Sequence, residues 1–594
     1  MKIFQLIRKN FVLIIFILIV IVATLLDGSP FVWGDGWGYY HTGKQIVSNG
    51  QLVADVKPDY YEYSMHGLWE LNGKYVTRYL PGNSVVWGPF MGVASFFDSG
   101  TKYDDYYKGY NGHSLAEGLA ILSASVTYTV IGLLALYKAL RILNFSKSSS
   151  VIAIATSFLS TYAWHYVFET PAVSHAYDLF GANVLLYLIL LLARERVAVK
   201  RRWLVLIGVG VVSGIITIVR PTNVFIVIAL ILYLTLSQKK NLGIYIKQGI
   251  YIGIGALPLF LFFLLFNYVT FGNPFANGYA VLGSTQFRFD EFYLFDLLFS
   301  NFRGWFVYSP LMLISIISLL FYVKAKLIRF TYTLLPIVLV VLIYSFWPIW
   351  YGGAGLGQRF FIVLMPFTSV GAAFLIDKIM VKAKLWLRIC MYIILGILTL
   401  YSSGLTLLYR FTPTNTLTEL FPRDNYMAGV SEEVQWTPFD MFRYHELLLK
   451  ESSSFKEYKH NLRESYRGRY SLIFLISGKT EPVIRIQPID EDSLYIHIIP
   501  NSTNRKSVFS LNVMIDYKGK SVYGERIGQI GMEKYQRILI KCQDEQCVSD
   551  WIGEVGPIKE NGSFRTKRRF SSMTILINST EPVFFADNRI KRTK

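Results

Sequence analysis

An acidic residue stands directly behind the first apolar segment of the chain. Residues 11–26 are almost entirely apolar, and Asp35 follows within the string Gly34-Asp35-Gly36-Trp37-Gly38. A carboxylate placed where a membrane span leaves the bilayer is costly unless it faces an aqueous cavity or a site. In a partly dry cavity such a carboxylate can take the proton of an attacking hydroxyl group. Asp35 is therefore the first candidate for chemistry, and the alternative is a solvated turn residue between glycines.

Further ionisable residues occupy short motifs at the ends of other apolar segments or in the long loop 27–114 that follows the first one. These motifs are Arg78-Tyr79-Leu80-Pro81-Gly82, Glu169-Thr170-Pro171, Arg220-Pro221-Thr222-Asn223 and Gly357-Gln358-Arg359. Each motif is weak alone, but together they put acids and arginines at one membrane depth. Two alternatives stay open: Glu169 could cap the helix that begins after Pro171, and Arg220 could be an interfacial anchor whose charged end reaches the head groups.

His175 and Asp178 lie three residues apart at the start of an apolar segment, so a helix places them on one face. With Glu169 they could bind a metal ion, whereas a hydrogen-bonded structural pair needs no third ligand. The sequence favours the structural pair, and we predict no metal site.

Composition places the chain in a membrane. Of its 594 residues, 53% are hydrophobic and 17% are charged, and the mean hydropathy is +0.37; a soluble domain carries about 25% charged residues. Much of the positive charge behind the net value of +19 lies in short loops between apolar segments, as the positive-inside rule predicts. Because no basic face interleaved with base-stacking aromatics stands apart from the membrane, nucleic-acid binding is not expected.

Apolar segments of bilayer-spanning length predict a polytopic α-helical membrane protein of about eleven spans. The segments are roughly 8–26, 115–137, 150–167, 176–193, 203–219, 222–237, 249–269, 305–323, 330–349, 360–377 and 386–409. Basic connections alternate with connections that lack Lys and Arg, such as 168–175 and 350–358, which predicts a cytoplasmic N-terminus. The loop 27–114 and everything after about residue 410 then lie outside. A bacterial cytoplasmic membrane fits a chain without a retention signal.

Three parts are expected along the chain. Residues 1–410 form the transmembrane domain with its long first outer loop, and an apolar stretch at 84–97 of that loop predicts an interfacial or re-entrant helix. Residues 411–455 are expected to be a linker. In 456–594, short β-prone runs between turn residues predict an extracytoplasmic β-sandwich-like domain.

The motifs resemble those of the GT-C superfamily of membrane glycosyltransferases, which includes protein O-mannosyltransferases and aminoarabinose transferases. The resemblance rests on the acidic string around Asp35, the Arg-Tyr-Leu-Pro-Gly run that leads into an interfacial helix, the Arg-Pro-Thr-Asn string, and Gly-Gln-Arg-Phe-Phe at the opening of a late span. A long first outer loop and a C-terminal outer domain also match. The resemblance covers about residues 1–410.

The resemblance implies an enzyme of the cell envelope that faces outward. Such enzymes take a sugar from a polyprenyl-phosphate carrier in the membrane lipid and pass it, usually with inversion, to a lipid, glycan or protein acceptor. It implies that Asp35 is the catalytic base or positions the acceptor, and that Glu169 is the second acid. The phosphate leaving group needs arginine donors, for which Arg359 and Arg220 are suited and Arg78 is a third candidate, or a divalent metal ion.

Other functions compete with this interpretation. A transporter or flippase for lipid-linked saccharides would need ionisable groups near the bilayer midplane or inverted repeats, and we find neither in the sequence. A non-catalytic scaffold for polysaccharide assembly would tolerate substitution of Asp35. A polymerase or ligase that elongates lipid-linked glycans would share the chemistry.

Overall fold

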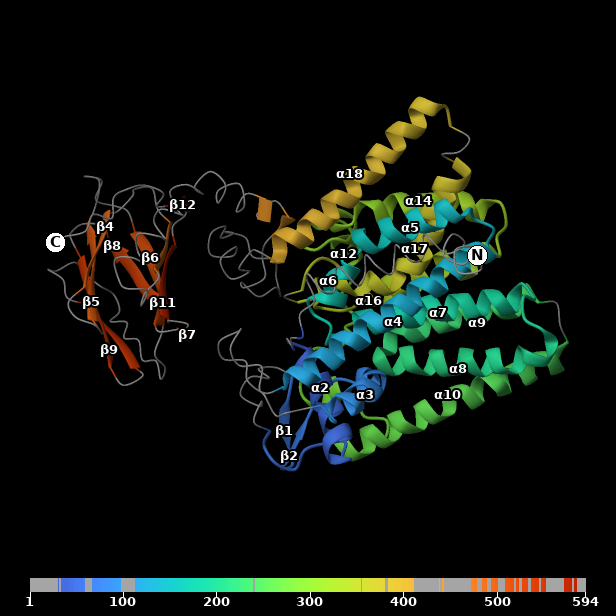
Figure 1. Ribbon diagram of the computed structural model, residues 1–594, viewed down its shortest axis with the longest axis horizontal. Coiled ribbons are helices and arrows are strands. Elements are labelled where there is room, and N and C mark those ends of the chain that lie inside the picture. Colours follow the sequence, from blue (N-terminus) through green and yellow to red (C-terminus); the bar gives the residue numbers. More distant parts are fainter. Residues whose placement is uncertain are drawn as a thin grey trace, which may run out of the picture. The chain divides into compact units, whose positions relative to one another are not determined.

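A computed structural model describes residues 30–97 and 113–410 apart from 31, 33, 59–66, 239–240, 354 and 380–382, and further residues around 437–442 and strands between 472 and 584 (Figure 1). The chain divides into two compact units, described here separately. One comprises Met1–Tyr103 and Tyr110–Leu407, and the other Asp104–Gly109 and Leu408–Lys594.

The first unit is built almost entirely from helices. In chain order they are α2 (Gly36–Lys44), η1 (Gln45–Asn49), α3 (Gly82–Ala94), α4 (Leu115–Ile142), α5 (Lys147–Ser160), α6 (Ala163–Phe168), α7 (His175–Ala193), η3 (Val199–Arg201), α8 (Arg202–Val219), η4 (Pro221–Asn223), α9 (Val224–Ser237), α10 (Leu242–Phe271), α11 (Gly278–Val281), α12 (Leu294–Phe299), α13 (Trp305–Tyr308), α14 (Pro310–Lys324), α15 (Arg329–Tyr332), α16 (Leu334–Tyr344), η5 (Arg359–Leu364), α17 (Met365–Phe374), η6 (Leu375–Ile379) and α18 (Leu385–Arg410).

Six helical segments of the described chain are long and apolar enough to cross a membrane: Leu115–Ile142, His175–Ala193, Val199–Val219, Leu242–Phe271, Arg359–Lys378 and Leu385–Tyr409. Shorter apolar helices are Pro221–Ser237, Pro310–Lys324 and Leu334–Tyr344. The chain is therefore a multi-pass helical membrane protein. The total of about eleven spans stays a prediction, and the first expected span, 8–26, lies outside the described residues.

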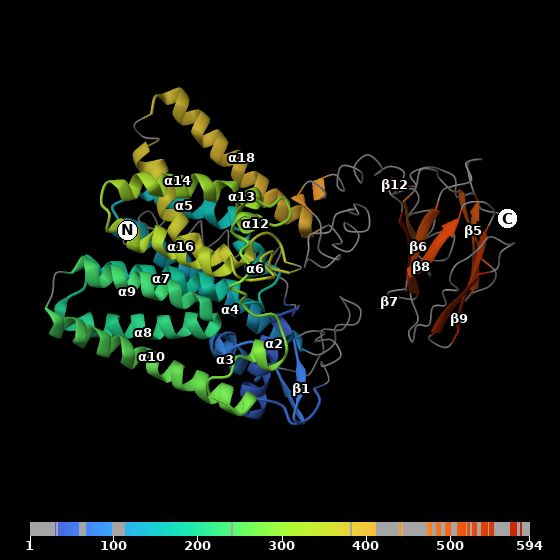
Figure 2. The same ribbon diagram turned by 180° about the vertical axis from the view of Figure 1, so that it is seen from behind.

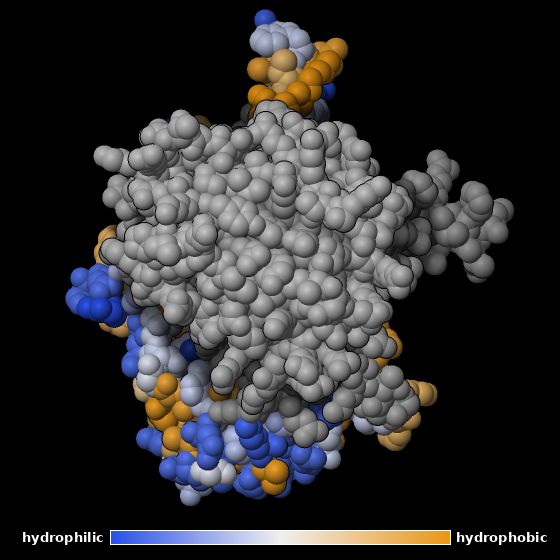
Figure 3. Space-filling view, turned by 90° about the vertical axis from the view of Figure 1, so that its left-hand side faces the viewer, coloured by the Kyte–Doolittle hydropathy of each residue, from blue (hydrophilic) through white to orange (hydrophobic). Residues whose placement is uncertain are grey.

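Two of these helices expose apolar side chains along most of their length. In α10 only 11% of the most apolar window is buried, and in α18 the exposed side chains include Ile393, Ile397 and Leu400. Figure 3 shows hydrophobic side chains on the helix that projects at the top of the view and hydrophilic side chains gathered at the lower edge. Exposed apolar surface of this extent is stable against lipid rather than water.

Within the bundle, helix α4 packs along α7, and α8 packs along α10 (Figures 1 and 2).

The start of α4 is joined to α2 by one buried carboxylate. A capping box opens α4: the Glu117 amide donates to Ser114 Oγ at 3.2 Å, and the Ser114 amide donates to Glu117 Oε2 at 2.9 Å. The same buried carboxylate accepts a hydrogen bond from the Tyr40 hydroxyl at 2.7 Å and pairs with Lys44. Both partners lie on α2, so one carboxylate fixes two helices.

The apolar run expected as one span over 150–167 is divided. Helix α5 ends at Ser160 and α6 begins at Ala163, because Tyr162 between them has a left-handed backbone with φ 60°. The buried Tyr162 hydroxyl donates to the carbonyl of Tyr308, which holds the aromatic side chain in place. A tertiary contact from a distant helix thus overrides the local apolar pattern.

The predicted first outer loop, residues 27–114, carries the first candidate residue. Asp35 occupies the N-cap position of α2. The antiparallel strands β1 (Trp69–Leu71) and β2 (Lys74–Val76) precede Tyr79 and α3, and α3 lies in the stretch expected to form an interfacial helix. A Cβ on Gly38 of α2 would lie 2.3 Å from Cδ2 of Tyr79. Only glycine permits this approach, so Gly38 sets how closely α2 packs against the connection between β2 and α3.

The second unit contains strands in two sheets. One sheet has the order β10-β9-β5-β4, and the other has the order β12-β3-β11-β6-β7 with β8 also paired to β6. The strands are β3 (Leu472–Ser477), β4 (Val483–Pro488), β5 (Ser493–Ile499), β6 (Val508–Tyr517), β7 (Lys520–Val522), β8 (Arg526–Gly531), β9 (Gln536–Gln543), β10 (Gln546–Trp551), β11 (Ser571–Asn578) and β12 (Pro582–Phe584). The sandwich-like packing and the limits of the linker stay predictions.

Gly38→Ala is expected to lower the free energy of unfolding by about 1–3 kcal/mol, because the added methyl group forces α2 and Tyr79 apart. The melting temperature of the detergent-purified protein measures this. Gly88→Ala on α3 is the matched control, since a Cβ there meets nothing within 4 Å. Equal melting temperatures for both variants would contradict the packing described.

Candidate functional site

A cavity of about 520 Å³ lies at the end of the bundle where α7 begins and α8 and α16 end. Its lining comes from α2, the connection between β2 and α3, the segment after α10, and the loop before η5. We call this last loop the glycine-rich loop, because it contains Gly352, Gly353, Gly355 and Gly357. The polar residues that line it are Asp35, Tyr39, Arg78, Tyr79, Ser174, His175, Arg220, Thr222, Asn277, Tyr279, Thr285, Gln286, Tyr344 and Arg359. Four of the predicted site residues, namely Asp35, Arg78, Arg220 and Arg359, thus share one cavity.

Asp35 is held by two partners from distant parts of the chain. Its Oδ1 accepts a hydrogen bond from the Tyr79 hydroxyl at 2.7 Å, and its Oδ2 pairs with Arg359 Nη2 at 3.2 Å. Burial opposes ionisation of the carboxyl group, but the Arg359 charge and the Tyr79 hydrogen bond together hold the pKa of Asp35 below its ordinary value of 3.8. About a third of the side chain is exposed, so an ionised carboxylate faces the cavity.

A glycine-rich loop surrounds the side chain of Arg359. Gly352 and Gly353 have φ values of +77° and +68°, a conformation that favours glycine. A Cβ on Gly355 would lie 3.0 Å from Cδ of Arg359 and 2.6 Å from the Tyr166 hydroxyl. The loop therefore leaves just enough room for the arginine to cross it and reach Asp35.

Arg78 belongs to the same network as Asp35. Its Nη2 donates to the Tyr79 hydroxyl at 3.0 Å and its Nη1 donates to Ser284 Oγ at 2.8 Å. The guanidinium also lies 5.0 Å from the centroid of the Trp69 ring and 5.1 Å from that of Tyr279. Burial and the nearby Asp35 charge raise the pKa of Tyr279 to about 12, so Tyr279 stays a neutral donor at physiological pH.

Arg220 lies at the junction of α8 and η4 and reaches the start of α7. Its Nη2 donates to Ser174 Oγ at 2.6 Å and lies 3.2 Å from His175 Nδ1. Its Nη1 lies 3.4 Å from Oδ2 of the buried Asp178. The side-chain amide of Asn223 donates to Asp178 Oδ1 at 2.6 Å, so the Arg-Pro-Thr-Asn motif supplies a hydrogen-bond donor and an ion-pair partner to the same carboxylate.

Glu169, predicted to be the second acid, does not line this cavity. It follows α6, and its Oε2 lies 3.0 Å from His165 Nδ1. The α7 N-cap is Ser174, with no side-chain capping hydrogen bond, so the alternative of a helix cap is not seen either. The rings of His165, Tyr166 and His175 contact one another edge to face, with centroid separations of 4.8 and 4.6 Å. This aromatic row separates Glu169 from Arg220.

The cavity suits an anion better than a divalent cation. Three guanidinium groups and one carboxylate occur among its described lining residues. A divalent cation prefers several oxygen ligands, and no group of three His, Cys, Asp or Glu side chains in the described chain is spaced to hold a metal ion. His175 and Asp178, the weak metal candidates, both contact Arg220.

Several aromatic residues of the cavity were not predicted as site residues. Tyr79 lies in a motif that the sequence singled out, but its contact with Asp35 depends on how α2 packs. Tyr344 stacks on Phe360 with a centroid separation of 4.5 Å and an interplanar angle of 8°. Tyr279 lies 6.0 Å from the ring of Trp347. The chain has 40 tyrosines, and an aromatic belt at the membrane interface would look the same in sequence.

Arg220→Gln is expected to lower the free energy of unfolding by roughly 3 kcal/mol, because it leaves the buried Asp178 charge without its partner. Asp178→Asn in the same chain removes that charge and should restore most of the loss. Melting temperatures of the single and double variants measure the coupling.

Arg288→Gln is the control for the loss of one arginine. Its partners Asp290 and Glu291 form an ion pair with it at the surface, and such pairs contribute little. A double variant no more stable than Arg220→Gln would show that Asp178 does not depend on this arginine.

Comparison with solved structures finds membrane enzymes at low identity. An oligosaccharyltransferase from Archaeoglobus fulgidus is 15% identical, with 72% of this chain and 59% of that chain covered and a TM-score of 0.39. The archaeal oligosaccharyltransferase AglB from Archaeoglobus fulgidus, in complex with an inhibitory peptide and a dolichol-phosphate, is 14% identical with 71% and 59% covered and a TM-score of 0.39. ArnT from Cupriavidus metallidurans, bound to undecaprenyl phosphate, is 11% identical with 79% and 83% covered and a TM-score of 0.40.

These proteins are membrane glycosyltransferases of the GT-C superfamily, which the motifs of this sequence resemble. This chain spans 59% of the length of the oligosaccharyltransferase in both of those structures. No family model and no curated protein matches the chain. At such identities and TM-scores the likeness does not extend to function, which has to be inferred from the residues of the cavity.

Proposed function

We propose that the protein transfers a sugar from a polyprenyl-phosphate carrier to an acceptor on the outer face of the membrane. The observation that carries this proposal is the pairing of Asp35 with Arg359 inside a cavity that two further arginines line. An ionised carboxylate beside an excess of guanidinium groups offers both a proton acceptor and a binding site for phosphate. Its place at the ends of apolar helices fits a substrate that is itself anchored in lipid.

Arg359 and Arg220 are the proposed donors to the phosphate group. The guanidinium carbons of both lie over the same ring, 5.9 and 5.7 Å from the centroid of Phe360. Two guanidinium groups so placed can donate charge-assisted hydrogen bonds to one phosphate. As the bond between the sugar and the phosphate breaks, negative charge grows on the phosphate oxygens, and these donors stabilise that charge.

Asp35 is the proposed general base. The acceptor oxygen or nitrogen attacks the anomeric carbon of the sugar while the bond from that carbon to the phosphate oxygen breaks. The acceptor proton passes to Asp35, and the electron pair of the broken bond leaves with the phosphate. One displacement of this kind inverts the anomeric centre. Tyr79 and Arg78 keep the carboxylate oriented toward the cavity.

The apolar part of the cavity offers a path for the carrier chain. Phe263 lines the cavity and belongs to α10, a helix whose other side chains are largely exposed. A polyprenyl chain that leaves along α10 stays in lipid while its phosphate reaches the arginines. Dolichol-phosphate and undecaprenyl phosphate are carriers of this class.

Asp35→Asn is expected to lower turnover of a polyprenyl-phosphate sugar by about a hundredfold or more, because it removes the base with little change of shape. Purified protein is incubated with a panel of such donors and an acceptor extract, and donor consumption is measured. Asp55→Asn, an exposed carboxylate of the same outer segment, is the matched control. No consumption of any donor, with full function of Asp35→Asn in cells, would instead favour a transporter or a scaffold.

The acid limb of the pH profile of kcat/KM should move to higher pH in the variant Arg359→Gln. A carboxylate whose pKa is depressed keeps its base form as pH falls, so kcat/KM of the wild type should hold down to the ordinary carboxyl pKa of 3.8. Burial raises the pKa of Asp35, and Arg359 is the largest influence that lowers it, so loss of Arg359 raises this pKa relative to the wild type. As the pH falls, Arg359→Gln should therefore lose activity at a higher pH than the wild type does. This shift is independent of any decrease in the maximum rate of the variant.

Arg359→Lys keeps the positive charge and is the control for this shift. Its acid limb should stay closer to that of the wild type than the limb of Arg359→Gln does. Superimposable profiles for all three proteins would show that the titrating group is not Asp35.

A further inference from the structure

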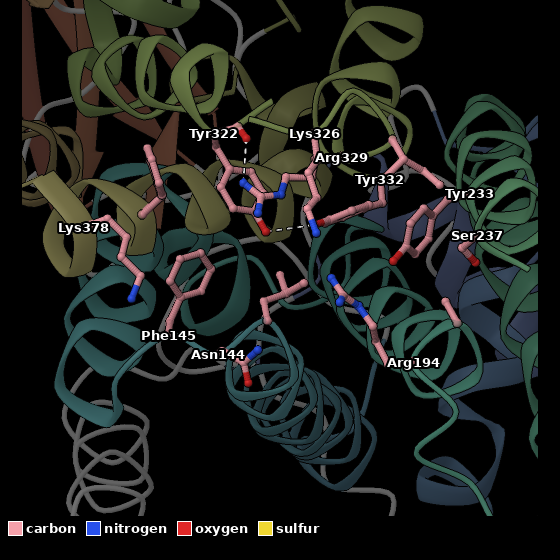
Figure 4. A pocket seen from close by; sticks show the side chains of 14 residues that line it. Asn144, Phe145, Arg194, Tyr233, Ser237, Tyr322, Lys326, Arg329, Tyr332 and Lys378 are labelled. Atoms are coloured by element: carbon pink, nitrogen blue, oxygen red, sulfur yellow. Dashed lines mark hydrogen bonds between the residues drawn. The ribbon is translucent and has the colours of Figure 1, made fainter. Parts of the chain in front are cut away.

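A second pocket, of about 950 Å³, lies at the opposite end of the bundle (Figure 4). Helix α7 connects the two sites: His175 at its start lines the first cavity, and Ala193 and Arg194 at its end line the second. Its 19 residues correspond to about 28 Å along the helix axis. This distance places the second pocket near the other surface of the membrane, on the side predicted to be cytoplasmic.

The second pocket gathers positive charge. Arg194, Lys326, Arg329 and Lys378 line it, and no acidic residue occurs among its described lining residues. Lys378 pairs with Asp377 at 2.7 Å; between the other three and a carboxylate, the described part of the chain holds no ion pair. The four cations come from three parts of the chain: Arg194 from the end of α7, Lys326 and Arg329 from the connection between α14 and α15, and Lys378 from η6. The packed bundle brings these three parts together.

Tyrosines orient these cations. Arg329 Nη1 donates to the carbonyl oxygen of Tyr322 at 2.8 Å, and its guanidinium lies 4.1 Å from the centroid of the Tyr322 ring. The hydroxyl groups of Tyr322 and Tyr332 lie 2.8 Å apart. In Figure 4 the side chains of Arg194, Lys326 and Arg329 converge around these hydroxyl groups. The pocket is thus a preformed set of donors, and Tyr233 closes it with a ring 4.4 Å from Tyr332.

Exposed apolar side chains stand next to lining residues of the pocket along the chain. Leu327 is 80% exposed and Leu236 is 55% exposed, and Ile328, which lines the pocket, is 36% exposed. A free phosphate ion would leave these side chains without a partner, whereas the acyl chains of a lipid would cover them. Basic pockets between spanning helices are the sites where anionic head groups bind.

We propose that this pocket binds the head-group phosphate of an anionic membrane phospholipid. Arg194, Lys326 and Arg329 donate to the phosphate oxygens, and the acyl chains lie along the apolar residues beside them. The site is separate from the cavity around Asp35, so it does not depend on the proposed transfer reaction. A bound lipid would bridge the end of α7, which supplies Arg194, and the connection from α14 to α15, which supplies Lys326 and Arg329.

The experiment measures lipid binding to the full-length protein in a nonionic detergent by native mass spectrometry. Short-chain phosphatidylglycerol, phosphatidylcholine and inorganic phosphate are the three probes. The variant Arg194→Gln with Lys326→Gln removes two donors, and the control Lys324→Gln with Lys384→Gln removes two exposed lysines at the same end that do not line the pocket. Phosphatidylglycerol should bind the first variant about tenfold more weakly than the wild type and bind the control unchanged.

Three results would overturn the proposal. One is equal binding of phosphatidylglycerol and phosphatidylcholine, and another is equal binding of phosphatidylglycerol by both variants. The third is displacement of the lipid by inorganic phosphate at a similar concentration, which would identify a site for a soluble anion. Melting temperatures show whether each variant is folded. If the double variant is not, Lys326→Gln alone, at an exposed side chain, gives the same test.

Discussion

The ion pair between Asp35 and Arg359 is the interaction on which the candidate site depends. It joins α2 to η5 across 324 residues of sequence. Either charge alone, at the end of a helix bundle in lipid, would carry a large desolvation cost. Each is stabilised by the other, and Tyr79 adds a hydrogen bond to the carboxylate. The start of α2 and the glycine-rich loop before η5 must therefore pack against each other, because neither buried charge is stable without the other.

The positive charge of Arg220 is balanced by a carboxylate outside the cavity. Arg220 contacts Asp178, which is fully buried and does not line the cavity. The carboxylate therefore balances the charge of Arg220 without occupying the space where a ligand would bind. Arg78 contacts a hydroxyl group, aromatic rings and Ser284. Counted together, three arginines face two carboxylates, and the remaining positive charge is what a bound phosphate would neutralise.

Sequence alone could predict the depth of these residues but not their position around the bundle. Asp35, Arg220 and Arg359 stand near the ends of apolar segments, Arg78 lies in the predicted first outer loop, and all four line the cavity. Glu169 has the same depth by sequence, yet an aromatic row separates it from Arg220. A hydropathy pattern gives the height of a residue along the membrane normal. Which helices are neighbours depends on packing, such as the approach of Tyr79 to Gly38.

The same distinction explains the division of the apolar run at Tyr162, since the contact with Tyr308 that holds it there comes from a distant part of the chain. It also explains why the basic pocket was not predicted. The sequence shows positive charge in the connections predicted to be cytoplasmic, as any membrane protein would have. Only the packed bundle shows that Arg194 meets Lys326 and Arg329.

The pairing of Asp35 with Arg359 has a consequence for the proposed chemistry. A carboxylate whose pKa an arginine holds low is ionised, but it is also a weak base. The same arginine is the proposed donor to the phosphate. When an anion binds, it competes with Asp35 for the guanidinium and adds negative charge nearby, and both effects raise the pKa of the carboxyl group. Asp35 then becomes a stronger base only when the carrier phosphate is bound. In the empty cavity Asp35 and Arg359 stay paired. In the proposed reaction, binding of the carrier phosphate to Arg359 releases Asp35 from this pair and makes it available as the base.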